Sequence, residues 1–225
     1  MALILKILLC FCLLPGLSAT SNAISVGHLT FSMAADKKMI SKYVVNNNEQ
    51  ARLYRISITA IDRPGEHEIR HSLTDGQLLF SPRQITLQPG EGNFFKFYYR
   101  GPQDNIERYY RVAFAEIPPQ NRLIRSGKSN AVSIMPVIVL ETILVVRPRQ
   151  VNFKWDYDSQ TGVVKNSGNT WFKLLAKPHC ETKEEDSKAW YLRPGESVRH
   201  DSLRGIGGKF IIYNDKFINI TDDCR

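Results

Sequence analysis

The chain has 225 residues, 43% of them hydrophobic, and carries a formal net charge of +8 at pH 7. This length suits two domains of ordinary size, each large enough for a core of its own. Lys and Arg residues are scattered, and no nucleic-acid-binding motif accompanies them. We therefore interpret the positive charge as a solvated basic surface and expect no nucleic-acid partner.

The first 23 residues have the pattern of a secretory signal peptide. Lys6 precedes the apolar run ILLCFCLLPGL, and Ser21 and Ala23 occupy the small-residue positions of a cleavage site. A transmembrane anchor is the alternative, but the run is shorter than the roughly 20 residues that a spanning helix needs. We expect residues 1–23 to be removed, and the mature chain to begin near Ile24 as an exported protein without membrane insertion.

The cysteine residues agree with export. Cys10 and Cys12 lie in the predicted signal peptide, so the mature chain keeps Cys180 and Cys224. An exported chain with two cysteines most simply forms one disulfide, and we predict that these two are bonded. A metal site is disfavoured because neither cysteine belongs to a C-x-x-C pair.

From Ile24 onward the hydrophobic pattern repeats every two residues, which is typical of β-strands. Short runs rich in β-branched and aromatic residues alternate with turns that contain Gly and Pro. In chain order, the strands that we expect are 52–60, 94–100, 109–117, 131–146, 150–157, 162–166, 170–177, 189–192, 209–215 and 216–220. The segment Arg147-Pro148-Arg149 separates two series of strands. We predict an all-β protein with two β-sandwich domains, an N-terminal domain at 24–146 and a C-terminal domain at 147–225.

The stretch HEIRH at 67–71 matches the H-E-x-x-H signature of zinc proteases, in which two histidines bind the metal and the glutamate acts as general base. That motif requires a packed helix, but only ten residues separate the turns on either side. Ile69 and Leu73 are the only apolar side chains between these turns, too few to bury a helix face. We interpret HEIRH as an inter-strand loop and expect no metal site.

Residues 131–146, AVSIMPVIVLETILVV, differ from the other expected strands because every position from Ile134 to Leu140 is apolar. Both faces of such a strand require burial. Pro136 has no backbone N–H, and proline is normally confined to edge strands or bulges. Two interpretations stay open: an edge strand whose outer face another chain covers, or an internal strand with Pro136 at a bulge.

Several runs resemble the periplasmic pilus chaperones, and more specifically the chaperones of the common-pilus system. These runs are FFKFYYRGPQDNIERYYRVAFAEIPP (94–119), TILVVRPRQV (142–151), GNTWFKLLAKP (168–178), WYLRPGE (190–196) and YNDKFI (213–218). The resemblance implies two immunoglobulin-like domains in a boomerang arrangement, with no enzymatic activity and no cofactor. It also implies that the last strand of the first domain completes a pilus subunit that lacks a strand, and that the subunit then passes to an outer-membrane usher.

The resemblance also assigns roles to single residues of the expected strand, which corresponds to a donor strand at 132–146. Its subunit-binding side chains are expected to point outward. They are Val132, Ile134, Pro136, Ile138 and Leu140. Val137 and Val139 are then expected to face the core of the chaperone itself.

A charge cluster between the two domains of the family corresponds to Glu107, Arg147 and Asp215. The family's two basic anchors for the terminal carboxylate of the subunit correspond to Phe31 and Ile143, which are both apolar. Other residues must supply any such anchor here. Our candidates are Lys42 and Arg111, because each lies in a strand-like setting near the expected cleft.

A structural or adhesive pilus component is the alternative function, because immunoglobulin-like sandwiches occur in both classes. A pilin should carry a free N-terminal extension, whereas this chain passes from Ile24 directly into SVGHLTFSM. We therefore favour a periplasmic chaperone whose partners are pilus subunits and an outer-membrane usher.

Replacing both His67 and His71 with Ala is expected to leave folding and pilus assembly unchanged, because a loop imposes no metal geometry on these side chains. Thermal unfolding, a pilus count and the zinc content of the purified protein are the measurements. Stoichiometric zinc that the double variant loses would contradict the loop interpretation.

Overall fold

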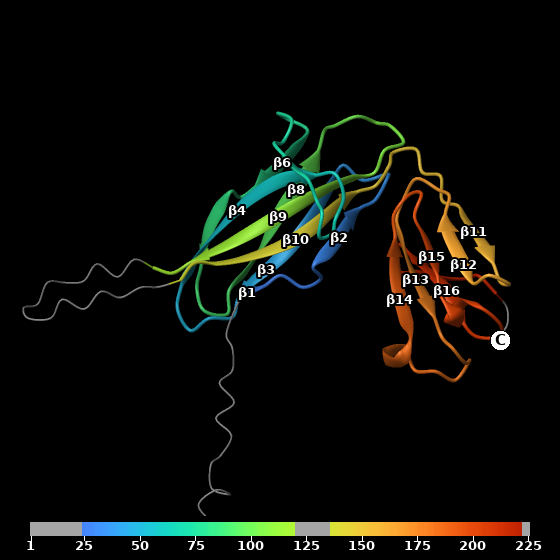
Figure 1. The fold of residues 1–225 in the computed structure, drawn as a ribbon. Coiled ribbons are helices and arrows are strands. Elements are labelled where there is room, and N and C mark those ends of the chain that lie inside the picture. The colour runs from blue at the N-terminus through green and yellow to red at the C-terminus, as the bar shows by residue number, and fades with distance from the viewer. Residues whose placement is uncertain (1–23, 120–135, 222–225) are drawn as a thin grey trace, which may run out of the picture.

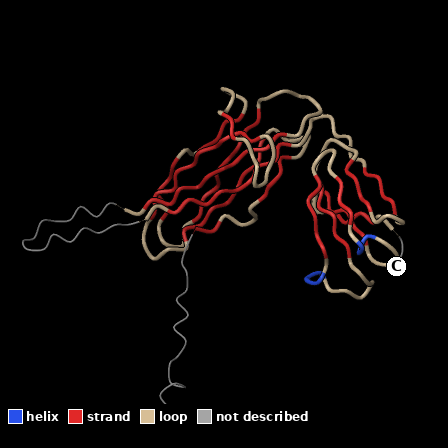
Figure 2. The backbone as a smooth tube through the Cα atoms, in the orientation of Figure 1, coloured by secondary structure: helices blue, strands red, loops and turns tan. Residues whose placement is uncertain are grey.

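The computed structural model describes residues 24–119 and 136–221. These residues form two β-sandwiches that meet at an angle (Figure 1). Apart from loops, nearly all of this part of the chain is in strands, with two short 3-10 helices, η1 (Glu184–Asp186) and η2 (Asp201–Leu203) (Figure 2). The prediction of an all-β protein with two immunoglobulin-like sandwiches is confirmed. In the same residues, none of the helices has the length and hydrophobicity that crossing a membrane requires.

The first sandwich packs a four-stranded sheet against a six-stranded sheet. The four-stranded sheet runs in the order β1 (Ile24–Ser25), β3 (Met39–Asn46), β8 (Gly92–Tyr99) and β6 (Leu78–Ser81). The six-stranded sheet runs in the order β2 (Thr30–Met33), β10 (Ile138–Val146), β9 (Arg108–Ile117), β4 (Arg52–Ile61) and β5 (Arg70–His71), with β7 (Gln84–Leu87) paired to β4.

The period of two explains how these strands bury one face. In β9, Tyr110, Val112 and Phe114 are buried and point into the sandwich, while the residues between them are partly exposed. Phe95 of the opposite sheet meets Phe114 edge to face at 5.7 Å between ring centroids. The first core is therefore built from aromatic and β-branched side chains on alternate positions, as the sequence predicts.

The second sandwich packs a three-stranded sheet against a four-stranded sheet. The first of these runs in the order β11 (Trp155–Asp158), β12 (Val163–Asn166) and β15 (Ser197–Arg199). The other runs in the order β14 (Lys188–Leu192), β13 (Phe172–Ala176), β16 (Lys209–Tyr213) and β17 (Lys216–Asn219). Asn214 and Asp215 join β16 to β17 with φ angles of 50° and 60°, the positive values of a tight hairpin turn.

Between β10 and β11 the chain forms no strand, so no sheet continues from one sandwich into the other. HEIRH is not helical: residues 67–69 form a loop and turn, and Arg70 and His71 form the short strand β5. The strand expected at 131–146 is described only from Pro136, and its ladder begins at Ile138. The predicted signal peptide lies outside the described residues.

Candidate functional site

Strand β10 has two neighbours along only part of its length. It pairs antiparallel with β9 from Ile138 to Val146, but parallel with β2 only from Ile143 to Val146. The N–H of Ile143 donates to the carbonyl of Leu29 at 2.7 Å, where the chain leaves the sheet toward β1. Among the described strands, none pairs with residues 138–142 on that side. Residues 138–142, the N-terminal part of β10, therefore form an open sheet edge.

The direction of the free backbone groups follows from the ladder. The N–H of Ile143 points toward β2, and backbone groups alternate sides along a strand, so those of Val139 and Glu141 point in the same direction. No described backbone group bonds to the N–H or C=O of either residue on that side. These two residues offer their hydrogen-bonding groups to an incoming strand.

The expected side-chain orientation in β10 is wrong. Leu140 packs against the first core, on the face that it shares with the buried residues Leu144 and Val146. Val139 lies on the opposite face, with Ile143. The even-numbered residues therefore point to the core side and the odd-numbered ones away from it. An uninterrupted apolar run contains no alternation from which the orientation could be read.

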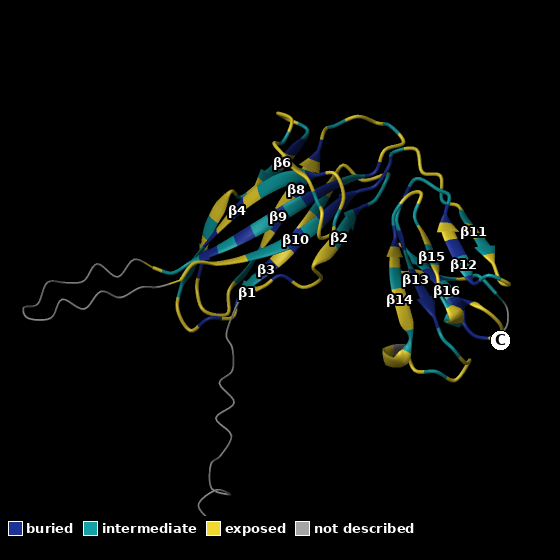
Figure 3. Ribbon diagram, viewed as in Figure 1, coloured by how far each residue is buried: buried dark blue, intermediate teal, exposed yellow. Residues whose placement is uncertain are grey.

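Near the end of the sandwich both faces of β10 become accessible, as the yellow start of this strand in Figure 3 shows. The exposed fractions are 54% for Val137, 45% for Ile138 and 56% for Val139, and Pro136 is exposed as well. Val132 and Ile134 lie outside the described residues. Ile138 is thus on the core-facing side of the sheet at a point that the core does not reach.

A buried polar network ends the core beside Ile138. The residue directly opposite Ile138 on β9 is Glu116, whose exposed fraction is 3%. Its carboxylate lies 3.3 Å from the Tyr54 hydroxyl and 3.3 Å from Nε of Arg52, and Asn46 lies 3.0 Å from the same hydroxyl. Because polar groups occupy this end of the sandwich, Ile138 has apolar surface that no described residue of the domain covers.

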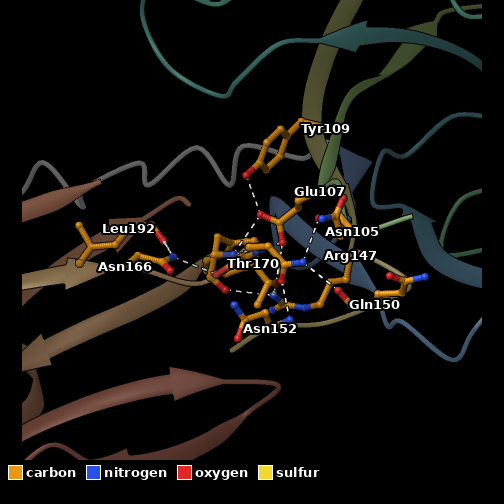
Figure 4. Close-up of polar contacts among 11 residues, drawn as sticks. Asn105, Glu107, Tyr109, Arg147, Gln150, Asn152, Asn166, Thr170 and Leu192 are labelled. Carbon is orange, nitrogen blue, oxygen red and sulfur yellow. Dashed lines mark hydrogen bonds and ion pairs between the residues drawn. The ribbon is translucent and has the colours of Figure 1, made fainter. Parts of the chain in front are cut away.

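The opposite ends of β9 and β10 meet the second sandwich in a buried joint (Figure 4). The Glu107 carboxylate accepts hydrogen bonds from the Tyr109 hydroxyl at 2.6 Å, the Thr170 hydroxyl at 2.7 Å and the Trp171 backbone N–H at 3.0 Å. Arg147 donates to the Thr170 hydroxyl at 2.5 Å and to the Trp171 carbonyl at 3.0 Å. Thr170 therefore links the carboxylate to the guanidinium, whose closest atoms are 3.6 Å apart.

Burial dominates the electrostatics of this joint. It raises the pKa of Glu107 and lowers the pKa of Arg147, although hydrogen bonds and the opposite charge act against both shifts. The Arg147 guanidinium also lies over the rings of Trp171 and Tyr213, at 5.1 and 4.5 Å from their centroids. Desolvation thus outweighs the mutual attraction of the pair, so the pair defines the geometry of the joint more than its stability.

Asp215, the third member of the expected cluster, lies in the exposed turn after β16. Its carboxylate adds a weak long-range attraction for Arg147, and no hydrogen bond or ion pair connects the two in the described part of the chain. Thr170 and Trp171 take its place in direct contact. Neither is predictable from the sequence, because a threonine and a tryptophan after a turn are ordinary at the start of a strand.

The linker adds backbone contacts on both sides of the joint. Nη1 of Arg149 donates to three carbonyl groups of the first domain, those of Ala34, Ala35 and Lys37, at 2.7 to 2.9 Å. Asn169 of the second domain donates to the carbonyl of Gln150 in the linker at 2.8 Å and to that of Asn105 in the first domain at 2.9 Å. The linker is thus fixed to both sandwiches.

A pocket of about 540 Å³ lies between the domains beside the joint. Its walls include Tyr109, Arg111, Ile143, Trp171, Tyr191 and Arg193. The Arg111 guanidinium is paired with Glu68 at 2.7 Å, and Arg193 is paired with Glu196. Arg111 therefore lies where a cleft residue is expected, but an internal carboxylate already binds it.

This ion pair explains the position of the HEIRH loop. Glu68 also binds Nε of Arg70 at 3.0 Å, and Arg70 forms two hydrogen bonds of 2.8 Å to the Glu141 carboxylate on β10. His67 and His71 are exposed. Within residues 24–119 and 136–221, no group of three or more His, Cys, Asp or Glu side chains is arranged to hold a metal ion. The loop covers the outer face of β9 and β10 through this chain of ion pairs.

Lys42, the other anchor candidate, does not line the pocket. It points into the first sandwich with an exposed fraction of 6%, donates to the carbonyl of His28, and lies 4.4 Å from the centroid of the Phe31 ring. Burial lowers its pKa to about 8. The geometry is that of a structural lysine at the edge between the two sheets.

Cys180 is disulfide-bonded. Its predicted partner, Cys224, lies outside the described residues. The pairing of the two stays a prediction.

Replacing Arg147 with Met is expected to destabilise the protein by about 3–5 kcal/mol, because it leaves the buried Glu107 carboxylate without a cation. The double variant Glu107→Gln, Arg147→Met should recover most of this loss, since neither charge is then buried. Urea unfolding of the two single variants and the double variant measures both effects. A loss under about 0.5 kcal/mol in Arg147→Met, as for an exposed pair, would contradict the buried joint.

Replacing Lys42 with Met is expected to raise the free energy of unfolding at pH 7 by about 1–3 kcal/mol, because a buried cation is removed and the contact with Phe31 is kept. In the native protein Lys42 loses its proton near pH 8 when folded and near 10.5 when unfolded. The unfolded state thus binds more protons between these values, and stability should rise with pH there.

This rise should be absent from Lys42→Met and present in Lys165→Met, which removes an exposed strand lysine. Urea unfolding between pH 7 and pH 10 makes the comparison. The same pH dependence in all three proteins would show that Lys42 is hydrated.

Comparison with known proteins defines the family. Residues 23–152 match the family described as pili and flagellar-assembly chaperone, PapD N-terminal domain. The chain is 58% identical over 204 residues to the probable fimbrial chaperone EcpE of Escherichia coli (strain K12), covering 91% of this chain and 86% of that protein. It is 29% identical over 221 residues to the probable fimbrial chaperone EcpB of Escherichia coli, covering 95% of this chain and 98% of that protein.

A solved structure shares the fold. A chain in the complex of the Salmonella enterica SafA pilin with the SafB chaperone superposes with a TM-score of 0.53 at 16% identity, over 89% of this chain and 94% of that chain. The protein belongs to the family of pili and flagellar-assembly chaperones that the PapD N-terminal domain defines.

Proposed function

We propose that the protein is a periplasmic chaperone of pilus subunits, and that a subunit adds a strand to the open edge of β10. The single observation that carries the proposal is the absence of a described pairing partner for residues 138–142, in the strand that the family resemblance identifies as the donor strand. The names of the relatives EcpE and EcpB, both probable fimbrial chaperones, support this function. Nothing in the structure favours the alternative of a structural pilus component.

Backbone groups supply the first part of the interaction. Val139 and Glu141 direct their N–H and C=O groups to the open side of β10, the side on which β2 pairs with residues 143–146. A strand that enters this position pairs with them and extends the six-stranded sheet, the binding mode known as β-strand addition. Main-chain hydrogen bonds of this kind are tolerant of the partner's sequence, which suits a chaperone that handles several related subunits.

Apolar side chains supply the second part. Ile138 is 45% exposed on the core-facing side of the sheet, where a partner's core continues the chaperone's own. Full burial of a side chain of this size contributes roughly 1.5–3 kcal/mol. Leu140 contributes less, since it is already partly buried in the first core. Pro136 lies beyond the start of the ladder.

The pocket between the domains lies in line with the end of this edge. Thr30 and Ile143 line it, and both belong to the strand pair at which the open edge stops. Of the two candidates for a carboxylate anchor, we retain Arg111, because it lines the pocket, and drop Lys42, because it does not. A subunit carboxylate would have to replace Glu68 as the partner of Arg111.

The remaining parts of the proposal follow from the family. Residues 1–23 export the chain to the periplasm, the bound subunit passes to an outer-membrane usher, and no catalysis and no cofactor take part. The charge cluster of Glu107 and Arg147, without direct contact from Asp215, fixes the orientation of the two domains.

Replacing Val139 with Pro is expected to leave the chaperone folded and to remove subunit binding. It deletes one N–H that points to the open side, and proline is tolerated on an edge whose N–H faces solvent. Val139→Ala, which shortens the same side chain but keeps the backbone N–H, is the matched control. Subunit survival in periplasmic extracts and thermal unfolding of the purified chaperone are the two measurements.

The orientation of β10 has a separate test. Ile138→Asp should stay folded and lose most subunit protection, because it places a charge where the partner's core packs. Val139→Asp, on the opposite face, should protect the subunit far better than Ile138→Asp. Normal subunit binding by both Val139→Pro and Ile138→Asp would rule out strand addition at this edge.

A further inference from the structure

The loop between β4 and β5, residues 62–69, forms part of the wall of the pocket between the domains. Pro64 lines this pocket together with Arg111 of β9 and Arg193 of the second domain. Nη1 of Arg193 donates to the carbonyl of Pro64 at 2.8 Å, which attaches the loop to the second domain. Glu68, four residues further along, attaches it to the first domain through Arg111. The loop thus connects both sides of the pocket.

Charge, rather than apolar packing, holds this loop on the sheet. Of residues 65–71, Glu68 is the one that is not exposed, and Ile69 next to it has an exposed fraction of 59%. Nε and Nη2 of Arg111 donate three hydrogen bonds of 2.7 to 3.1 Å to the Glu68 carboxylate. Segments that bury few apolar side chains open at low cost in free energy. The position of the loop therefore depends mainly on one ion pair.

The base of the loop is closed independently of that ion pair. The N–H of Ile69 donates to the Asp62 carboxylate at 2.7 Å, and the N–H of Asp62 donates to the carbonyl of Ile69 at 3.1 Å. Beyond these two residues, β4 and β5 pair as antiparallel strands. Release of Glu68 would therefore free the tip of a hairpin and leave its base in place.

Opening of the loop leaves every guanidinium of this region with a carboxylate. Arg70 binds both Glu68 and Glu141, and its two bonds to Glu141 of 2.8 Å remain when Glu68 departs. Arg111 alone loses its partner, and its Nε and Nη2 can then bind both oxygens of another carboxylate in the same geometry. The exchange replaces one ion pair with an equivalent one and moves only Glu68 into water.

We propose that residues 62–69 are a lid over the pocket, and that Glu68 competes with a carboxylate of the bound subunit for Arg111. The lid rests on the proposed function, in which Arg111 is the anchor of that carboxylate. Glu68 belongs to the same chain as Arg111, so its effective concentration is far above that of any free carboxylate in solution. A subunit that has added a strand to β10 is tethered as well, and its carboxylate competes on equal terms. The lid thus reserves Arg111 for a ligand that already occupies the open edge.

Competition between two chaperones for one subunit tests the lid. The native chaperone and a variant carry different affinity tags and are expressed together in the native host, and the pilus subunit that co-purifies with each tag is quantified. Glu68→Gln keeps the size of the side chain and removes its charge. It should hold about three- to tenfold more subunit than the native chaperone, because apparent affinity rises with the fraction of protein in the open state.

Two further variants define the cause of this gain. Arg111→Gln removes the anchor and should hold less subunit than the native chaperone, and addition of Glu68→Gln to it should change nothing. Glu185→Gln removes an equal charge from an exposed position of the second domain and should leave the shares equal. Glu68→Ala, which also removes the hydrogen-bonding atoms, should give the same gain as Glu68→Gln.

An equal or smaller share for folded Glu68→Gln or Glu68→Ala, with thermal unfolding as the check, would overturn the lid. A gain that persists in the Arg111→Gln chaperone would overturn it too, and so would failure of both Glu68 variants to fold. Val139→Pro in the same assay separates the lid from the proposed function. It should lose the subunit whatever the Glu68 variants do, and a full share for Val139→Pro would contradict strand addition and, with it, the lid.

Discussion

From Ile138 to Thr142, strand β10 forms sheet hydrogen bonds with β9 on one side and with no described strand on the other. The rest of the molecule is arranged around this constraint. A partner strand cannot come from β2, because the chain turns away at Leu29 to reach β1 in the other sheet. An apolar edge strand without a partner is an aggregation hazard in most proteins. Here the neighbouring end of the core closes with the polar network around Glu116.

The same two strands connect this edge to the second domain. Glu107 immediately precedes β9 and Arg147 immediately follows β10, so the ladder that exposes the edge at one end carries the interdomain joint at the other (Figure 1). Thr170 joins the two charges, and Arg149 fixes the linker to the first domain. The distance between the open edge and the pocket near the joint is therefore fixed. Burial disfavours both charges, so the joint contributes geometry more than stability.

The sequence predicts those strands in which hydrophobic and polar residues alternate. In β9, the large hydrophobic side chains of Tyr110, Val112 and Phe114 at every second position mark both the strand and its buried face, and the sequence predicts both. In β10 the run from Ile134 to Leu140 has no alternation, so the strand is predictable but its orientation is not. The expectation that Ile138 and Leu140 point away from the core was wrong for this reason.

Side-chain contacts between residues far apart in the chain are also not predictable from the sequence. Glu68 pairs with Arg111 across 43 positions of the chain, which turns the second residue of HEIRH into a structural anion. Lys42 is buried beside Phe31, although a lysine in a strand is usually exposed. The contacts of Thr170 at the joint depend on how two domains meet, and no local pattern contains that information.

Hydrogen exchange of single backbone amides tests the open edge of β10 most directly. In the free chaperone the N–H groups of Val139 and Glu141 should exchange rapidly, while that of Leu140, directed toward β9, should be protected. Binding of a pilus subunit should slow exchange at Val139 and Glu141 by orders of magnitude and change Leu140 little. Unchanged rapid exchange at both residues in a stable complex would contradict strand addition at this edge.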